Sequence, residues 1–294
     1  MERVLVTGPD GFVGRHLRTE LGEAFVPFDG NVLDADAVGA AVRDTQPSAV
    51  VHLAAESSVA ASWEDTFRAW RVNVDGAVNM LEAVRREQPQ ARVLYPSTGE
   101  VYGNAGRFPT PEDEPVAPIS PYAVTKAAAE LACALPGTDV VVARAFNHEG
   151  PGRDDRFAVG SWTRQIARLE AEGGGTLLVG DLSAERDLTD VRDVCRAYRL
   201  LLDPSVPAGT YNVASGEARP LADVVEILVG LAQCPVTVRQ NPARVRAVDV
   251  RVLAGDASRL RDATGWRPEI PLEQTLADAL EHARAVEGEE RAAG

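Results

Sequence analysis

Short runs of β-branched and aliphatic residues alternate with longer segments rich in alanine and leucine along the first half of the chain. The runs RVLVT, SAVVHL, ARVLYPS and TDVVVARAF have the length and composition of buried strands, and a helical or loop segment follows each of them. Strands joined by crossover helices run parallel to one another, so this order predicts a parallel sheet with helices on both faces. We therefore expect an α/β protein built on a doubly wound parallel sheet.

The pattern changes after about Asn147. The stretch EGPGRDDRF is typical of a loop, AVGSWTRQIARLEAEGGG of a helix that ends at its three glycines, and GTYNVASG of a strand. Two further helices are expected near residues 222–231 and 272–286, and the polar tail EGEERAAG is expected to fray. These segments predict a smaller, mixed α/β C-terminal domain that lies over the sheet.

Composition narrows the class of protein. The chain has 294 residues, 45% of them apolar, which is enough for one large domain or two coupled ones. The net charge of −14 argues against a nucleic-acid surface, which needs a basic patch. Cys133, Cys195 and Cys234 lie far apart, and the histidines are scattered, so no metal site is expected. Without a secretory signal or an apolar run that could span a membrane, we expect a cytoplasmic setting.

The stretch VLVTGPDGFVGRHL places Gly8, Gly11 and Gly14 at the turn from the first strand into the first helix. Glycines there let the backbone approach a pyrophosphate, and the helix N-terminus supplies N–H donors and the positive end of its dipole. With a strand before it and a helix after it, the turn predicts a Rossmann-like dinucleotide site to which Phe12 and Val13 also contribute.

The residues after the second strand bear on the choice of cofactor. Asp29 ends the run AFVPFD at about the 20-residue offset where an acidic residue meets the adenosine ribose hydroxyls. An acid there repels a 2′-phosphate, so NAD(H) is favoured. Arg15 could reach such a phosphate, which keeps NADP(H) as the alternative. Asn31 and Val32 are expected at the adenine edge, and Asp34 is expected to cap the next helix.

Lys126, in ISPYAVTKAAAE, is the single lysine of a chain with 30 lysine and arginine residues. Ser120 and Pro121 predict the N-cap and first position of a helix on which Tyr122 and Lys126 share a face. A nearby ammonium stabilises a phenolate and lowers its pKa, which makes tyrosine a usable general acid or base. A surface ion pair of Lys126 with Glu130, beside a packing tyrosine, is the alternative interpretation.

Tyr-x-x-x-Lys behind a GxxGxxG turn resembles the extended short-chain dehydrogenase/reductases. Their third catalytic group is a Ser or Thr after the fourth strand, and in LYPSTGEVYG the resemblance selects Thr98, with Glu100 as a further acid or base. The stretch VVHLAAESSVAASW is similar to the family's loop after the third strand. This similarity implies cofactor contacts from Leu53, Ala54 and Ala55, and a sugar contact from Ser57.

The resemblance extends over nearly the whole chain and indicates a nucleotide-diphosphate sugar as the substrate. RAFNHEGPG is similar to a motif of the dehydratases and reductases that act on GDP-linked sugars, and VGDLSAERDLTDVRDV is most similar to the reductases. The resemblance implies substrate contacts from Asn147, Val179, Arg186 and Arg246, with the two arginines clamping the diphosphate. The chain has Arg246-Ala-Val-Asp249 where the reductases have Arg-Pro-x-Glu, which implies a reshaped loop.

The resemblance also implies how the chain is divided and assembled. An NAD(P)-binding domain is expected over residues 1–148, with 187–214 returning to it. The nucleotide-sugar-binding domain is expected over residues 149–186 and 215–294. Homodimers formed through two helices are usual in the family, and we expect the helices near residues 73–86 and 120–135 to form that interface.

The leading hypothesis is reduction of a 4-keto-6-deoxyhexose linked to a nucleotide, GDP by resemblance. Tyr122 would donate a proton to the keto oxygen, and NAD(P)H would deliver a hydride to C4. Thr98 would orient the keto group, and Lys126 would tune the acidity of Tyr122. A 4-epimerase that retains NAD is the alternative. A 4,6-dehydratase is less favoured, because the middle residue of Thr98-Gly99-Glu100 lacks a functional group. A non-catalytic binding relative is the third hypothesis.

Overall fold

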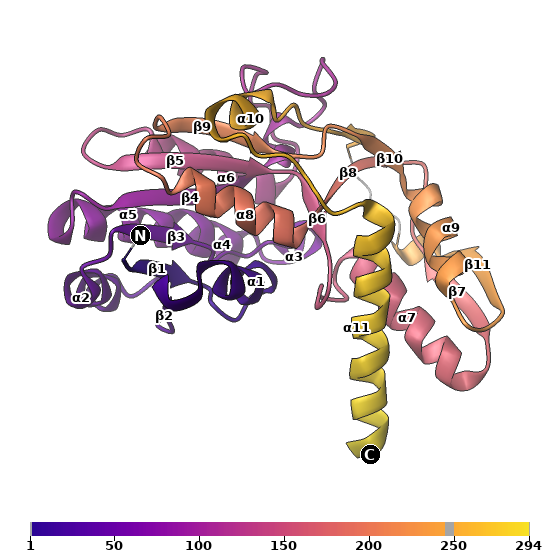
Figure 1. The fold of residues 1–294 in the computed structure, drawn as a ribbon. Helices are drawn as coiled ribbons and strands as arrows, with labels where there is room; N and C mark the ends of the chain where they lie inside the picture. Colours follow the sequence, from indigo (N-terminus) through magenta and orange to yellow (C-terminus); the bar gives the residue numbers. More distant parts are fainter. Residues whose placement is uncertain (1, 245–249, 294) are drawn as a thin grey trace.

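Six parallel strands form the main sheet of the protein (Figure 1). The structure is a computed structural model that describes residues 2–244 and 250–293. The strand order is β2-β1-β3-β4-β5-β9. The strands are β1 (Val4–Thr7), β2 (Phe25–Phe28), β3 (Ala49–His52), β4 (Arg92–Thr98), β5 (Asp139–Ala145) and β9 (Gly209–Val213). The four runs first assigned to strands, together with AFVPFD and GTYNVASG, are all confirmed.

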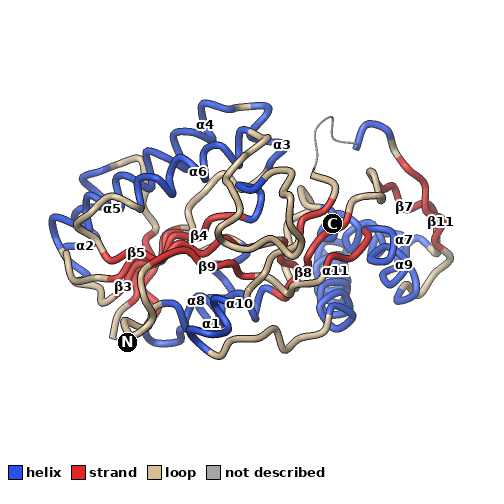
Figure 2. The backbone as a smooth tube through the Cα atoms, turned by 90° about the horizontal axis from the view of Figure 1, so that it is seen from above, coloured by secondary structure: helices blue, strands red, loops and turns tan. Residues whose placement is uncertain are grey.

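Helices cover both faces of this sheet, as Figure 2 shows. One face carries α2 (Ala35–Thr45), α3 (Val59–Glu64), α4 (Thr66–Trp70), α5 (Gly76–Glu87) and α6 (Pro121–Cys133). The other carries α1 (Phe12–Leu21), α8 (Val191–Leu201) and α10 (Ser258–Thr264). Successive residues of β1 enter different cores, because side chains of a strand alternate between its two faces: Val4 and Val6 pack toward α1 and α8, and Leu5 packs toward α2 and α5. The doubly wound α/β fold is confirmed.

The rest of the chain forms smaller sheets packed on three helices. One sheet contains β6 (Asn147–Glu149), β8 (Glu185–Asp190), β10 (Ala218–Pro220) and β12 (Val252–Leu253). The other contains β7 (Gly175–Val179) and β11 (Val236–Gln240). Apolar side chains of α7 (Ala158–Glu172), α9 (Leu221–Leu231) and α11 (Leu272–Ala293) share one core with β7. In the described residues, no helix is long and apolar enough to cross a membrane.

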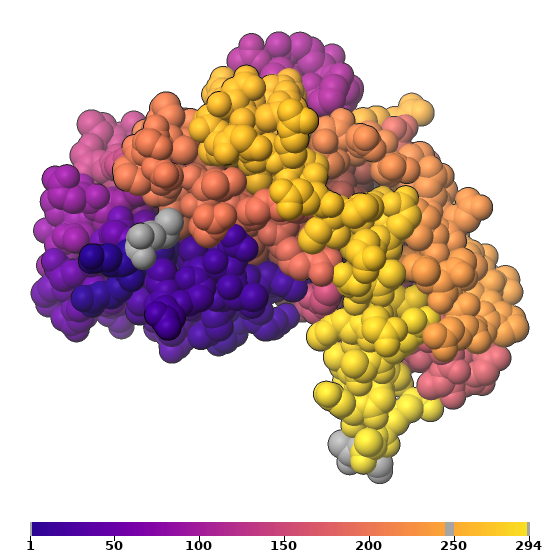
Figure 3. Space-filling view, in the orientation of Figure 1, coloured from indigo at the N-terminus to yellow at the C-terminus, as the bar shows by residue number. Residues whose placement is uncertain are grey.

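The C-terminal helix corrects one expectation. The tail EGEERAAG does not fray at its start: α11 continues to Ala293, and the C-terminal segment projects from the body of the molecule (Figure 3). Glu287 accepts a hydrogen bond of 2.9 Å from Arg291 and lies 3.5 Å from Arg168 of α7. Glu290 pairs with Arg164, also on α7. These contacts to a neighbouring helix hold residues that the polar sequence alone would leave frayed.

Candidate active site

A cleft of about 550 Å³ lies where the carboxyl ends of β1, β3 and β4 meet the C-terminal part of the chain. In doubly wound sheets, ligands bind at this edge. Fifteen predicted site residues line the cleft. They are Gly8, Gly11, Phe12, Val13, Gly14, Leu53, Ala54, Ala55, Ser57, Thr98, Glu100, Tyr122, Lys126 and Asn147, together with Arg15, which was weighed for the 2′-phosphate.

The turn between β1 and α1 requires glycine at two positions. Gly8 has a φ of +66°, in the region that glycine adopts most readily. A Cβ on Gly14 would lie 2.4 Å from the carbonyl oxygen of Gly8, so no side chain fits there. The N-cap residue of α1, Gly11, makes no side-chain capping bond. The first N–H groups of α1 therefore remain available, and the turn fits the pyrophosphate of a dinucleotide.

Helix α6 carries Tyr122 and Lys126 and begins as predicted. The Ser120 side chain accepts a hydrogen bond of 3.2 Å from the Ala123 N–H, and Pro121 is the first helical residue. The Tyr122 N–H donates to the Ser62 hydroxyl of α3 at 3.0 Å. The start of α6 is thus fixed by its own cap and by a neighbouring helix.

A buried ion pair fixes the middle of α6. Glu130 accepts a hydrogen bond of 2.6 Å from Arg144 of β5, and both side chains are 9% exposed. Ser97, at the end of β4, donates a hydrogen bond to the same carboxylate. Glu130 therefore pairs with Arg144, and the surface ion pair considered for Lys126 is not formed.

Thr98 and Tyr122 both line the cleft, so their hydroxyls can serve one substrate oxygen. Burial and the charge of Glu100 raise the pKa of Tyr122 above its ordinary value, whereas the nearby Thr98 hydroxyl and Arg153 lower it. The expectation that a neighbouring ammonium lowers this pKa is wrong for this structure. Burial of the phenol outweighs the favourable charges, and the tyrosine keeps its proton.

Lys126 lies under the cleft, and its side chain is nearly fully buried. Its Nζ is 4.2 Å from the centre of the Tyr95 ring, an arrangement typical of a cation–π contact. Burial lowers the pKa of Lys126 to about 8, against the opposing effects of Cys133 and Glu130. The only lysine of the chain is therefore an ammonium held in a largely apolar place, on the helical face that it shares with Tyr122.

Polar groups from β6 complete the cleft. The Asn147 Oδ1 is buried and has no hydrogen-bond partner among the described residues, as expected for an atom that a ligand would complete. His148 bonds to the Phe146 carbonyl oxygen through Nδ1 at 2.9 Å, and burial lowers its pKa to about 4. This histidine is neutral and structural. Within the described residues, no group of three or more His, Cys, Asp or Glu side chains is placed to hold a metal ion.

Several predicted contacts lie elsewhere. Asp29 and Asn31 are exposed and do not line the cleft. Val32 packs in the core below α2 and α5, and Val179 packs in the core of the C-terminal part. Arg186 is buried and donates to the carbonyl oxygens of Glu185 and Arg251 at 2.9 and 3.4 Å. Arg246, with the rest of Arg246–Asp249, lies outside the described residues. The binding roles of these residues stay predictions.

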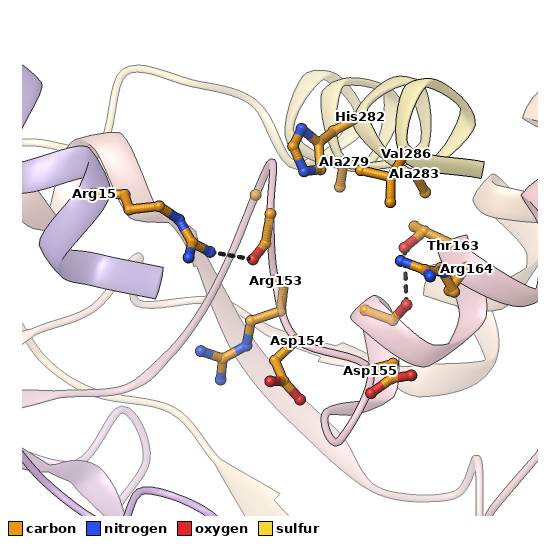
Figure 4. A pocket seen from close by; sticks show the side chains of 13 residues that line it. Arg15, Arg153, Asp154, Asp155, Thr163, Arg164, Ala279, His282, Ala283 and Val286 are labelled. Atoms are coloured by element: carbon orange, nitrogen blue, oxygen red, sulfur yellow. Dashed lines mark hydrogen bonds between the residues drawn. The ribbon is translucent and has the colours of Figure 1, made fainter. Parts of the chain in front are cut away.

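The sequence reasoning missed five lining residues from the loop between β6 and α7: Gly152, Arg153, Asp154, Arg156 and Phe157. No signal in the sequence distinguishes Arg153 from the many other arginines. Nearby, a second pocket of about 430 Å³ adjoins the same loop, between α1, α7 and α11 (Figure 4). There Arg15 donates a hydrogen bond of 3.1 Å to the Gly152 carbonyl oxygen, so its side chain points toward this loop.

The fold, the glycine turn and the cleft that unites Thr98, Tyr122 and Lys126 define an enzyme of the extended short-chain dehydrogenase/reductase class. The family model described as GDP-mannose 4,6 dehydratase matches residues 18–279, and the chain belongs to that family. The resemblance drawn from the motifs is thereby confirmed.

Individual relatives span nearly the full length of the chain. A GDP-6-deoxy-D-mannose reductase of Pseudomonas aeruginosa is 38% identical over 289 residues, which cover 94% of this chain and 95% of that protein. The structure of RMD from Pseudomonas aeruginosa, complexed with NADPH, matches with a TM-score of 0.88 at 36% identity and covers 97% of this chain and 100% of that one. A UDP-glucose 4-epimerase of Thermus thermophilus, complexed with NAD, matches with a TM-score of 0.83 at 28% identity and covers 96% and 99%.

Replacement of Lys126 by methionine is expected to increase the free energy of unfolding at pH 7, because methionine fills a similar volume without a buried charge. The ammonium has a pKa of about 8 in the folded protein and 10.5 ordinarily. Between these pH values the unfolded chain binds the proton more tightly, so this group makes the wild type more stable as pH rises. Urea unfolding of the wild type and of Lys126→Met from pH 7 to 10.5 should show that the difference between their free energies of unfolding decreases as pH rises. Parallel pH profiles would contradict the assignment.

Proposed function

We propose that the chain is an NAD(P)H-dependent reductase that acts at C4 of a nucleotide-diphosphate-linked 4-keto-6-deoxyhexose, with GDP as the nucleotide. The observation that carries this proposal is the full-length similarity to a GDP-6-deoxy-D-mannose reductase, together with Thr98, Tyr122 and Lys126 in one cleft. The glycine turn, which has no room for a Cβ at Gly14, supports a bound dinucleotide.

Proton transfer is assigned to Tyr122. When bound, the reduced nicotinamide supplies the hydride that C4 of the keto sugar accepts. The Tyr122 hydroxyl donates its proton to the keto oxygen as negative charge develops there, and Thr98 holds the same oxygen by a second hydrogen bond. Lys126 lines the same cleft with its Nζ over the Tyr95 ring, and its ammonium is assigned to a hydrogen bond with the nicotinamide ribose, which would orient the cofactor beside Tyr122.

The raised pKa of Tyr122 is compatible with a reductase. A reductase needs the protonated phenol at the start of its chemical step, whereas an epimerase first removes a proton from the C4 hydroxyl. Burial and Glu100 both favour the protonated form. The epimerase stays the second candidate, because a NAD-bound UDP-glucose 4-epimerase has the same fold.

We also propose the division into two domains described above. The position of β9 beside β5 supports the return of residues 187–214 to the cofactor domain. The separate core of α7, α9 and α11 supports a second domain for the nucleotide sugar, whereas α10 packs on the main sheet and belongs with the cofactor domain. In this arrangement Ser57 and Asn147 contact the sugar from opposite sides of the cleft, and Arg186 contributes to the binding of the diphosphate.

Replacement of Tyr122 by phenylalanine should abolish oxidation of NADPH by GDP-4-keto-6-deoxymannose, because the ring remains and the proton donor is lost. The Kd for NADPH should be nearly unchanged. Tyr211→Phe is the matched control: Tyr211 lies on β9, its hydroxyl donates to the Pro207 carbonyl oxygen, and the variant should retain turnover. Absorbance at 340 nm follows the reaction. A Tyr122→Phe enzyme with normal turnover would refute the assignment.

The function is tested on the wild type by denaturing protein purified without added cofactor and identifying the released nucleotides by mass spectrometry. We expect a site that exchanges its cofactor and a GDP-linked 4-keto sugar that oxidises it. Stoichiometric retained NAD, with no oxidation of added NADH or NADPH, would instead favour the epimerase or the dehydratase.

NAD(H) is proposed as the favoured nucleotide, with NADP(H) as the alternative. The Asp29 carboxylate at the end of β2 supports this, because it would repel a 2′-phosphate. Asp29→Ala should therefore lower the ratio of the Kd for NADPH to the Kd for NADH, by roughly tenfold if one charge contact is involved. Asp36→Ala, which removes a charge from α2, is the control. Titration calorimetry measures both constants, and an unchanged ratio would remove Asp29 from the cofactor site.

We infer that the protein is a homodimer formed through α5, α6 and the short helices beside them. Apolar side chains are exposed on this face: Phe67 (86%), Leu131 (74%), Leu135 (67%) and Trp63 (56%). Figure 2 places α3, α4 and α6 together on the outer side of the sheet. An exposed apolar patch of this kind is typical of an interaction surface.

Leu131→Arg should convert the dimer into a monomer, because two charges would be buried face to face across a two-fold axis. Val238→Arg, an equally polar change at an exposed valine of β11, should leave the dimer intact. Light scattering after size exclusion measures both masses. A monomeric wild type, or a dimeric Leu131→Arg variant, would contradict this interface.

A further inference from the structure

Arg153 has an unusual environment for an arginine. It lies in the loop between β6 and α7, and its side chain is only 11% exposed. The guanidinium carbon is 3.6 Å from the centre of the Phe157 ring and 4.8 Å from that of the Phe12 ring. Two aromatic rings therefore hold the guanidinium at the wall of the cleft by cation–π contacts, which fix its position without using its N–H donors.

Glu149 forms an ion pair with Arg153 but, within the described part of the chain, leaves one of those donors, the Nε, without a hydrogen bond. The Nε of Arg153 is buried and has no hydrogen-bond partner among the described residues, and the same is true of Oε2 of Glu149. These two atoms are 3.6 Å apart, too far for a hydrogen bond. Burial raises the pKa of Glu149 to about 7, although Arg153 opposes the shift. A buried arginine without hydrogen bonds is costly unless a ligand completes it.

The guanidinium faces the cleft. Arg153 lines the cleft with Tyr122, and Figure 4 shows its side chain extending away from His282 and α11. Phe12, on which it packs, is the first residue of α1. The positive charge of Arg153 therefore lies beside the uncapped N-terminus of α1, where the glycine turn leaves room for phosphate oxygens.

We propose that Arg153 is a binding residue for the diphosphate of a nucleotide held in the cleft, which it would contact beside the glycine turn. A guanidinium fork binds two phosphate oxygens at once, and the two rings hold that fork before the ligand arrives. Arg15, through its bond to the Gly152 carbonyl oxygen, ties the same loop to α1. The inference rests on the proposed function, because both the cofactor and the nucleotide sugar carry a diphosphate.

Titration calorimetry on the full chain, with NADPH and GDP as separate probes, tests this proposal. In Arg153→Ala, the Kd for one probe should rise by about tenfold to a hundredfold, as expected for loss of a charge-assisted pair. If only NADPH binds more weakly, the ligand of Arg153 is the cofactor diphosphate. If only GDP binds more weakly, the ligand is the diphosphate of the sugar nucleotide. Arg153→Lys, which keeps the charge and loses the fork, should give a smaller rise and remains informative if Arg153→Ala does not fold.

Arg168→Ala is the matched control, since it removes an arginine of α7 that is half exposed and paired with Glu287. It should leave both constants unchanged. If Arg153→Ala binds both probes as tightly as the wild type, the inference is wrong and the proposed function stands. If the wild type binds neither probe, the proposed function itself fails.

Discussion

The ion pair between Glu130 and Arg144 fixes the geometry of the active site. Arg144 belongs to β5 and Glu130 to α6, and Ser97 at the end of β4 bonds to the same carboxylate. Glu130 lies one helical turn after Lys126 on α6. The pair therefore fixes the distance between α6 and the end of β4, which carries Thr98. Removing one partner of a buried pair generally costs about 3–5 kcal/mol, because the other charge is left buried without compensation.

In the cleft beside this ion pair, burial favours the uncharged form of the ionisable side chains. Burial raises the pKa values of Tyr122 and Glu149 and lowers those of Lys126 and His148. All four shifts have the same cause, which is removal from water. A cleft of this kind suits a reaction in which a proton moves to an oxygen as charge appears there, because little solvent competes for that charge.

Much of the fold could be predicted from the sequence because its signals are local. The strands, the cap at Ser120 and the glycine turn depend on residues close together in the chain, and Tyr122 and Lys126 share a face through helix geometry alone. The rest depends on distant partners. The Tyr95 ring under Lys126 belongs to another strand, and Val32 and Val179 proved to be core residues. The end of α11 is held by arginines of α7, and Arg153 differs from other arginines only in its surroundings.

The solitary lysine has a consequence for the surface of the molecule. Because Lys126 is the only lysine and lies below the cleft, side-chain amines are absent from the outer surface, where all the basic groups are guanidinium or imidazole. Acylation and other amine-directed modification of side chains can thus reach the protein only through the cleft. With a pKa of about 8, a substantial share of this amine is unprotonated and nucleophilic in mildly alkaline solution. Among side chains, an ordinary amine reagent small enough to enter would therefore label only Lys126 of the active centre.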